Sequence, residues 1–154
     1  MNLFLRTVRC MTLLALLCLV AGCKTTDMAN DGSLASTLIT GHTETEIQQA
    51  TIAVFQANGF DQLADLTFEK QGSQRDTVMF GGLDSERVWI KIRVHVSPRG
   101  KDRYVLGCDA YAVQNHGDRF IETESRFKFS KGEECLDLLE QIRQQLSRPG
   151  PETR

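Results

Sequence analysis

The chain has 154 residues, with 18 lysine and arginine residues against 20 aspartate and glutamate residues, so its formal net charge at pH 7 is −2. This length suits one domain that buries a hydrophobic core without needing disulfide or metal staples. A mixed-charge, slightly acidic chain lacks the basic footprint of a nucleic-acid-binding protein and the polybasic patch that anionic lipids attract, so we exclude both kinds of electrostatic partner.

The first 22 residues have the features of a secretory signal peptide. Arg6 and Arg9 precede an apolar run, residues 11–20, that is interrupted only by Thr12. The run is about half as long as a helix that crosses the hydrocarbon core, so a permanent transmembrane helix is not expected. The small residues at the end of the apolar run fit either ordinary signal-peptide cleavage or cleavage at a lipid-modified cysteine.

The four residues Val20-Ala21-Gly22-Cys23 resemble the lipobox of bacterial lipoproteins. The resemblance implies cleavage before Cys23, a diacylglyceryl group on its sulfur and, usually, acylation of the new amino terminus. Two or more acyl chains make membrane attachment stable, whereas one chain binds weakly and reversibly. Lys24, in place of aspartate, implies sorting to the outer membrane, facing the periplasm, by the rule known for many Gram-negative lipoproteins.

A polar tether and a helix are expected after the lipid anchor. Residues 23–36 are mainly small and polar, which predicts a flexible tether, and a single domain is expected from residue 37 to residue 147. Residues 37–40 favour a short edge strand. Thr43 and Glu46 then form a capping-box pattern, which predicts the start of a helix. Its apolar positions at helical spacing are Ile47, Ala50, Val54 and Ala57.

Apolar residues next recur at every second position, which is typical of β-strands with one buried face. The stretches are residues 64–68, 78–80, 88–96, 104–112 and 121–129. They predict a five-stranded antiparallel meander, or six strands if residues 37–40 add one. A final helix is expected to place Cys135, Leu138, Leu139, Ile142 and Leu146 on one stripe, and residues 148–154 to form a disordered tail.

The turns predict how the strands pair. Placing Pro98 opposite Asp102 brings Val94 opposite Leu106, and every apolar residue of both strands then lies on one face. By the same reasoning, the turn at residues 115–118 brings Leu106 beside Phe127. Two apolar helix stripes and one apolar sheet face predict an α+β, two-layer sandwich, with the N-terminal and C-terminal helices packed on one face of the sheet.

This order of elements is similar to the helix-grip or TBP-like modules of small envelope lipoproteins such as BamC. The similarity covers roughly residues 37–146, is architectural and depends on no diagnostic residue. Because one fold hosts many functions, it implies only a role in envelope assembly or binding.

Cys108 and Cys135 are the cysteines that remain once the signal is removed and Cys23 is lipidated. Both occupy core-facing positions of their predicted elements. In an oxidising envelope they either form one disulfide, which ties the last helix to the sheet, or pack as two small apolar side chains.

No catalytic, metal-binding or cofactor-binding pattern is found in the sequence. His42, His95 and His116 have no neighbouring ligand at metal-site spacing, so we interpret them as surface histidines. Ser125 and Lys128 match the Ser-x-x-Lys spacing, but residues three apart on a strand point to opposite faces. The protein is therefore not expected to be an enzyme.

Met79, Trp89 and Tyr111 are expected on the outward faces of three strands. They form either an apolar interaction patch or ordinary cross-strand packing. The leading hypothesis is a non-enzymatic, lipid-anchored scaffold or adaptor for other envelope proteins. The alternative is a module that holds a small apolar or glycan ligand between the sheet and a helix.

Overall fold

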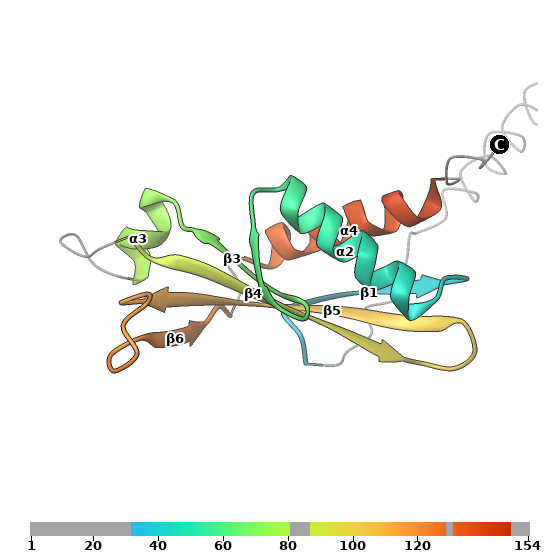
Figure 1. Ribbon diagram of the computed structural model, residues 1–154, viewed down its shortest axis with the longest axis horizontal. Helices are drawn as coiled ribbons and strands as arrows, with labels where there is room; N and C mark the ends of the chain where they lie inside the picture. The colour runs from blue at the N-terminus through green and yellow to red at the C-terminus, as the bar shows by residue number, and fades with distance from the viewer. Residues whose placement is uncertain (1–31, 81–86, 129–130, 149–154) are drawn as a thin grey trace, which may run out of the picture.

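A computed structural model describes residues 32–80, 87–128 and 131–148 (Figure 1). The signal peptide, the lipobox with Cys23, most of the tether and residues 149–154 of the tail lie outside the described residues. Nothing in the structure bears on those predictions.

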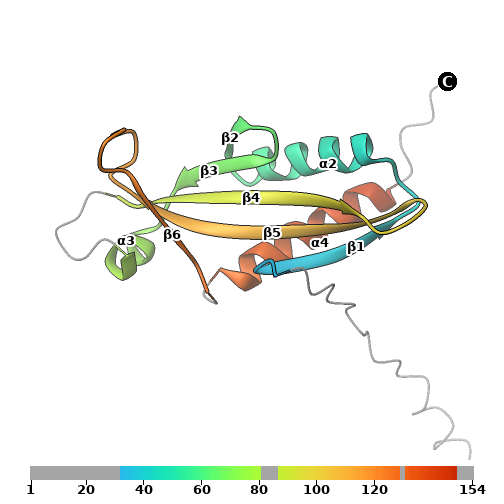
Figure 2. The same cartoon turned by 90° about the horizontal axis from the view of Figure 1, so that it is seen from below.

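The described residues form an α+β sandwich, as predicted. The elements in chain order are β1 (Ala35–Thr40), α2 (Glu44–Ala57), β2 (Asp61–Ala64), β3 (Thr67–Gln71), α3 (Gln74–Phe80), β4 (Trp89–Pro98), β5 (Arg103–Gln114), β6 (Thr123–Arg126) and α4 (Gly132–Ser147). The strands form one open antiparallel sheet in the order β1-β5-β4-β3-β2, with β6 also paired to β5. Helices α2 and α4 lie side by side on one face of this sheet (Figures 1 and 2).

Strand β5 organises the sheet because it pairs along both of its edges. Strand β4 runs along one edge. On the other edge, β1 pairs with its first half, from Arg103 to Cys108, and β6 pairs with its second half, from Tyr111 to Gln114. Strands β2 to β6 form an antiparallel meander of five strands, although two of the five predicted stretches differ as described below, and β1 is the sixth strand. Since β1 begins at Ala35 and both Ala35 and Ser36 are buried, the first strand of the domain starts two residues before the predicted domain boundary.

The capping box of α2 is confirmed. The Thr43 amide donates to Glu46 Oε2 at 2.7 Å, and the Glu46 amide donates to Thr43 Oγ1 at 3.3 Å. The two helices bury most of the predicted stripe residues against the even-numbered residues of β4 and β5, but Ala57 is exposed, Leu146 is only partly buried, and Phe55 is buried without having been predicted. The buried helix residues include Ile47, Ala50, Val54, Phe55, Cys135, Leu138, Leu139 and Ile142.

The predicted strand at residues 78–80 is wrong, because residues 74–80 form helix α3. The Ser73 amide donates to Asp76 Oδ2 at 2.9 Å, and the Asp76 amide donates to Ser73 Oγ at 3.2 Å. This reciprocal pair starts the helix, and a serine followed by an acid three residues later is its sequence signal. The alternation of two apolar residues was too short to outweigh that signal.

The stretch at residues 64–68 is a hairpin, not the single strand that was predicted. Asp65 has a φ of 46°, so the chain reverses between β2 and β3, and Ala64 is exposed. The predicted strand at residues 121–129 is also shorter, because β6 covers only residues 123–126.

The predicted strand registers are wrong by even numbers of residues. Val94 pairs with Cys108, not with Leu106, and β6 places Arg126 opposite Tyr111. Both turns are longer than expected, and their positive φ values, 52° at Asp102 and 54° at Asn115, set the new pairing. An even shift leaves each side chain on its face, so the buried face was still predicted correctly.

Candidate functional site

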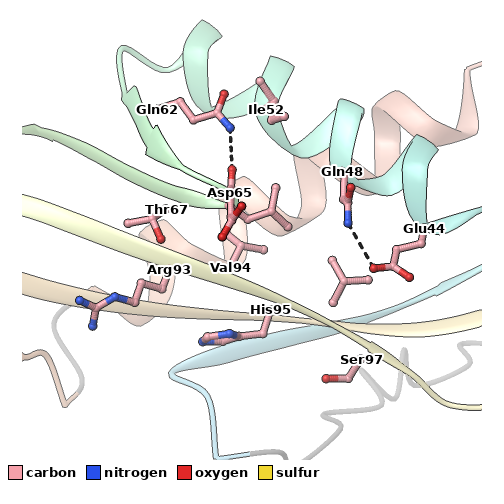
Figure 3. Close-up of a pocket in the computed structure, with 12 residues that line it drawn as sticks. Glu44, Gln48, Ile52, Gln62, Asp65, Thr67, Arg93, Val94, His95 and Ser97 are labelled. Atoms are coloured by element: carbon pink, nitrogen blue, oxygen red, sulfur yellow. Dashed lines mark hydrogen bonds between the residues drawn. The ribbon is translucent and has the colours of Figure 1, made fainter.

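A half-open groove lies between α2, the β2–β3 turn and the far end of β4 (Figure 3). We call it the α2–β4 groove. It has a volume of about 830 Å³, and its lining residues are Glu44, Gln48, Ile52, Gln62, Asp65, Leu66, Thr67, Arg93, Val94, His95, Val96 and Ser97.

The groove exists because β4 is longer than its neighbour β3. Pairing between the two strands runs from Gln71 opposite Trp89 to Thr67 opposite Arg93. The last contact is the Val94 amide, which donates to the Leu66 carbonyl at 2.9 Å. Before Leu66 in the sequence, the hairpin turn at Asp65 directs the chain away from β4 and into β2. In the part of the chain that the structure describes, residues 95–98 therefore pair with β5 on one side and with no strand on the other.

The unpaired edge of β4 directs backbone groups into the groove. Antiparallel strands turn the N–H and C=O of successive residues to opposite edges. Even-numbered residues of β4 point toward β3, as the Val94 amide shows, whereas Arg99 donates to Arg103 on the β5 side at 2.8 Å. The N–H and C=O of Val96 therefore point into the groove. Pro98 ends this edge, since proline has no N–H to offer.

Two acids line the groove, Glu44 at the start of α2 and Asp65 in the β2–β3 turn. The Glu44 carboxylate accepts a hydrogen bond from Gln48 Nε2 at 3.2 Å, and the Asp65 carbonyl accepts one from Gln62 (Figure 3). Within the described residues, neither the Glu44 nor the Asp65 carboxylate has an ion-pair partner. Because the cationic groups nearby pair with other acids, these two carboxylates leave the groove with a net negative charge.

The opposite, helix-free face of the sheet carries a set of paired charges, which we call the outer-face cluster. It comprises Glu69, Lys91, Arg93, Asp109, Glu124 and Arg126. Lys91 Nζ lies 2.8 Å from Glu124 Oε1, and Arg93 Nη2 lies 2.6 Å from Glu124 Oε2. Burial alone would raise the pKa of Glu124, but the hydrogen bonds from the two cations outweigh it and lower that pKa.

Asp109 and Arg126 of the outer-face cluster bind the residues just before β1. Asp109 Oδ1 accepts hydrogen bonds from the Leu34 amide at 3.0 Å and from Arg126 Nε at 3.2 Å. Arg126 Nη2 also donates to the Gly32 carbonyl at 2.6 Å. A hollow of about 490 Å³ lies beside these residues. The pairing fixes the point where the preceding chain enters the domain.

Each histidine lies next to one carboxylate. His42 Nδ1 is 3.9 Å from Glu46 Oε2, and His95 Nε2 is 3.5 Å from Asp109 Oδ2. His116 Nε2 is 3.0 Å from Glu69 Oε2, a contact between positions 47 residues apart that no local pattern predicts. The described residues contain no group of three or more potential metal ligands.

The predicted patch of Met79, Trp89 and Tyr111 is only partly assembled. Trp89 and Tyr111 lie on the outer face of neighbouring strands, but Met79 belongs to helix α3, so its predicted strand position is wrong. The His116 ring stacks on Trp89 with centroids 4.2 Å apart, and the Arg93 guanidinium lies 4.4 Å from the Tyr111 centroid. Polar side chains therefore cover both aromatic rings.

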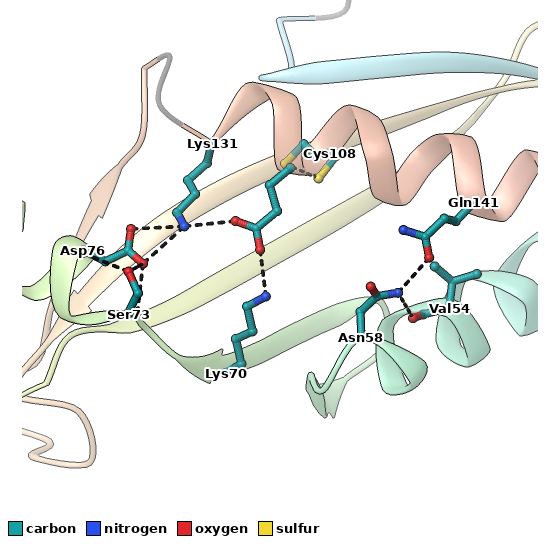
Figure 4. A network of polar contacts seen from close by, with 10 residues as sticks. Val54, Asn58, Lys70, Ser73, Asp76, Cys108, Lys131 and Gln141 are labelled. Carbon is teal, nitrogen blue, oxygen red and sulfur yellow. Dashed lines mark hydrogen bonds and ion pairs between the residues drawn. The ribbon is translucent and has the colours of Figure 1, made fainter.

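Cys108 and Cys135 meet in the core, where β5 faces α4 (Figure 4). Both are free and fully buried thiols, and their sulfurs lie 2.6 Å apart. The hydrogen bond with Cys135, together with burial, raises the pKa of the Cys108 thiol well above its ordinary value. The spatial convergence that the disulfide prediction requires is present.

An ion-pair network fastens the start of α4 to α3 and β3 (Figure 4). Lys131 Nζ lies 3.1 Å from Asp76 Oδ1 and 2.9 Å from Glu134 Oε2, and Glu134 Oε1 lies 2.7 Å from Lys70 Nζ. Burial by itself would raise the pKa of Asp76 and of Glu134. For Asp76, hydrogen bonds from Ser73 and Lys131 outweigh the effect of burial. For Glu134, hydrogen bonds from Lys70 and Lys131 do the same. Both pKa values therefore lie below normal.

Replacing Lys131 by methionine should lower the free energy of unfolding at pH 7 by about 1–2 kcal/mol. This loss lies between those measured when an exposed ion pair and a buried ion pair are broken. Acids with lowered pKa values stabilise the fold above their unfolded pKa values, and this stability is lost as pH falls through the folded pKa values. The variant should therefore lose less stability than the wild type as pH falls below about 4.5. Urea unfolding from pH 7 to pH 3 measures this, with Lys101→Met as the exposed control. Parallel pH profiles for wild type and Lys131→Met would contradict the expectation.

No helix among the described residues is both long and apolar enough to span a membrane. Comparison of the chain with models of protein families, with curated proteins and with solved structures finds no match.

Proposed function

We propose that this protein is a non-enzymatic, lipid-anchored component of the cell envelope that acts as an adaptor for another envelope protein. The α2–β4 groove carries the proposal, since it combines a net negative charge with an unpaired strand edge. Such an edge is a template for pairing with another chain. The lipobox resemblance at Cys23 supports attachment to a membrane, with the outer membrane as the proposed destination.

The polar residues of the outer-face cluster are occupied in contacts with one another. The cations of the outer-face cluster are paired with acids of the same cluster, and Glu69 pairs with His116. In the described part of the chain, no buried side-chain nitrogen or oxygen lacks a hydrogen-bond partner. These contacts hold neighbouring strands and the start of β1 together, which supports a structural role for the cluster.

A second candidate function is binding of a small apolar or glycan ligand. The groove lies between the sheet and a helix, and its volume falls in the range of small-molecule sites. Gln48, Gln62, Thr67 and Ser97 line it with side chains that can hydrogen-bond to hydroxyl groups. The half-open shape and the Val96 edge favour a polypeptide over an enclosed ligand.

The anchor is tested in the native envelope by mass spectrometry and fractionation. The wild-type chain should begin at an acylated Cys23 and sediment with membranes. Cys23→Ser should lack the lipid and leave the membrane fraction, whereas the matched control Cys18→Ser, which is removed with the signal, should behave as wild type. Affinity capture should recover an envelope protein with the wild type. A wild-type chain with an unmodified Cys23 would refute the proposed anchor.

A further inference from the structure

We infer that the α2–β4 groove receives an extended segment of the partner protein, which adds as a short strand to the open edge of β4 and carries alternating apolar residues and a basic residue. This inference rests on the proposed function and specifies how the partner is recognised. It follows from three independent properties of the groove, which are its backbone groups, its side chains and its charge.

The backbone of β4 supplies the pairing groups. Val96 directs one N–H and one C=O into the groove, in continuation of the ladder that ends where Val94 donates to Leu66. A polypeptide in extended conformation repeats donors and acceptors at the spacing that such an edge requires. A glycan or an apolar small molecule carries no such repeat. Beyond Val96, Pro98 offers only its carbonyl, so the added strand is short.

The side chains of the groove impose alternation on the occupant. Neighbours on adjacent strands point to the same face. A residue of the segment that lies opposite Val96 therefore points toward Ile52 of α2. The side chains of Val96 and Ile52 are both partly buried against the core. The residues on either side of that segment residue lie opposite His95 and Ser97 and point to the outer face. Apolar side chains are thus favoured at every second position.

The charge of the groove specifies a cation. Arg93 is the cationic lining residue that is charged at neutral pH, and it is paired with Glu124, whereas Glu44 and Asp65 have no ionic partner in the described chain. A lysine or arginine at either end of the segment reaches one of these carboxylates. An acidic segment would meet like charge and bind more weakly.

The experiment uses a defined probe, the peptide Lys-Val-Ser-Val-Ser-Val-Ser-Lys, and the full acylated chain in detergent, labelled with nitrogen-15. Amide exchange by NMR should show a fast-exchanging Val96 amide in the free chain. Saturating peptide should slow this exchange at least tenfold. The same peptide with N-methylated valines and serines retains composition and charge but cannot form the ladder, and it should not protect Val96.

Variants separate the backbone contribution from the charge contribution. Val96→Pro removes the N–H that faces the groove and should weaken peptide binding more than tenfold, whereas Val96→Thr keeps the N–H, loses only part of the apolar contact and should weaken binding much less. The pair Glu44→Gln and Asp65→Asn should weaken binding several-fold and reduce its salt dependence. Glu133→Gln, an exposed acid on α4, is the charge control and should have no effect.

Several outcomes would overturn the inference. A Val96 amide that is already protected in the free chain would mean that another segment of this chain occupies the edge. Protection by chitotetraose but not by the peptide would assign the groove to a glycan. Failure of the peptide to bind at millimolar concentration, or equal binding of the N-methylated peptide, would exclude strand addition. If Val96→Pro folds and still captures the envelope partner as the wild type does, strand addition at β4 is excluded and the adaptor role remains. An unmodified Cys23 would refute the lipid anchor alone.

Discussion

The oxidised chain is expected to be more stable to unfolding than the reduced chain by about 3–4 kcal/mol. A bond between Cys108 and Cys135 closes a loop with a sequence separation of 27 residues, and the loop-entropy relation gives this magnitude. The two sulfurs are already in contact between β5 and α4, so little rearrangement is needed. Because the pKa of the Cys108 thiol is raised, its thiolate is scarce in the folded chain, and attack by Cys108 should be easier during oxidative folding than afterwards.

Urea unfolding with and without reductant measures the difference. The variant Cys135→Ala should show no dependence on reductant and should match the reduced wild type to within the cost of a small cavity. Cys18→Ser, in the signal segment, should keep the wild-type response. Two titratable thiols at Cys108 and Cys135 in unfolded, unreduced protein from the native envelope would rule out the bond.

The variant Phe68→Ala should lose about 3–5 kcal/mol of unfolding free energy, the range for removing a fully buried phenylalanine ring. Phe68 of β3 has no exposed surface and stacks on Phe55 of α2 with ring centroids 4.2 Å apart. Phe55 in turn contacts Phe60 edge-on at 5.2 Å, so the three rings join α2 to the sheet. Removing the Phe68 ring leaves a cavity directly between the two layers.

Thermal and urea unfolding of the purified chain test this expectation. Phe120→Ala provides the matched control, because the Phe120 side chain is 97% exposed and its removal should change stability by less than about 0.5 kcal/mol. Equal destabilisation by the two substitutions would show that the ring cluster does not hold α2 on the sheet.

The local patterns of the sequence were sufficient to predict the layers. The alternation at residues 88–96 and 104–112 predicts two long strands with one apolar face, and β4 and β5 confirm it. The Thr43–Glu46 pair predicts where α2 starts. Alternation and helical spacing depend on side chains a few positions apart, so they are readable without knowing which elements touch.

Helix α3 and the Asp65 turn depend on local signals that the alternation obscured. The Ser73–Asp76 pair was visible in the sequence, but two alternating apolar residues suggested a strand. The pairing of β4 with β5 differed by two residues because the positive φ at Asp102 lengthens the turn, and apolar alternation is identical for any even shift.

The candidate site was decided only by the tertiary structure. The amino-acid order alone determined two apolar helix stripes, a sheet with one apolar face and two cysteines at core positions, because each of these is a periodic or positional property of a single segment. Whether β3 ends before β4, and so leaves Val96 facing an acidic groove, depends on how segments distant in sequence pair. The His116–Glu69 contact and the meeting of Cys108 with Cys135 likewise join distant positions, so only the folded chain brings them together.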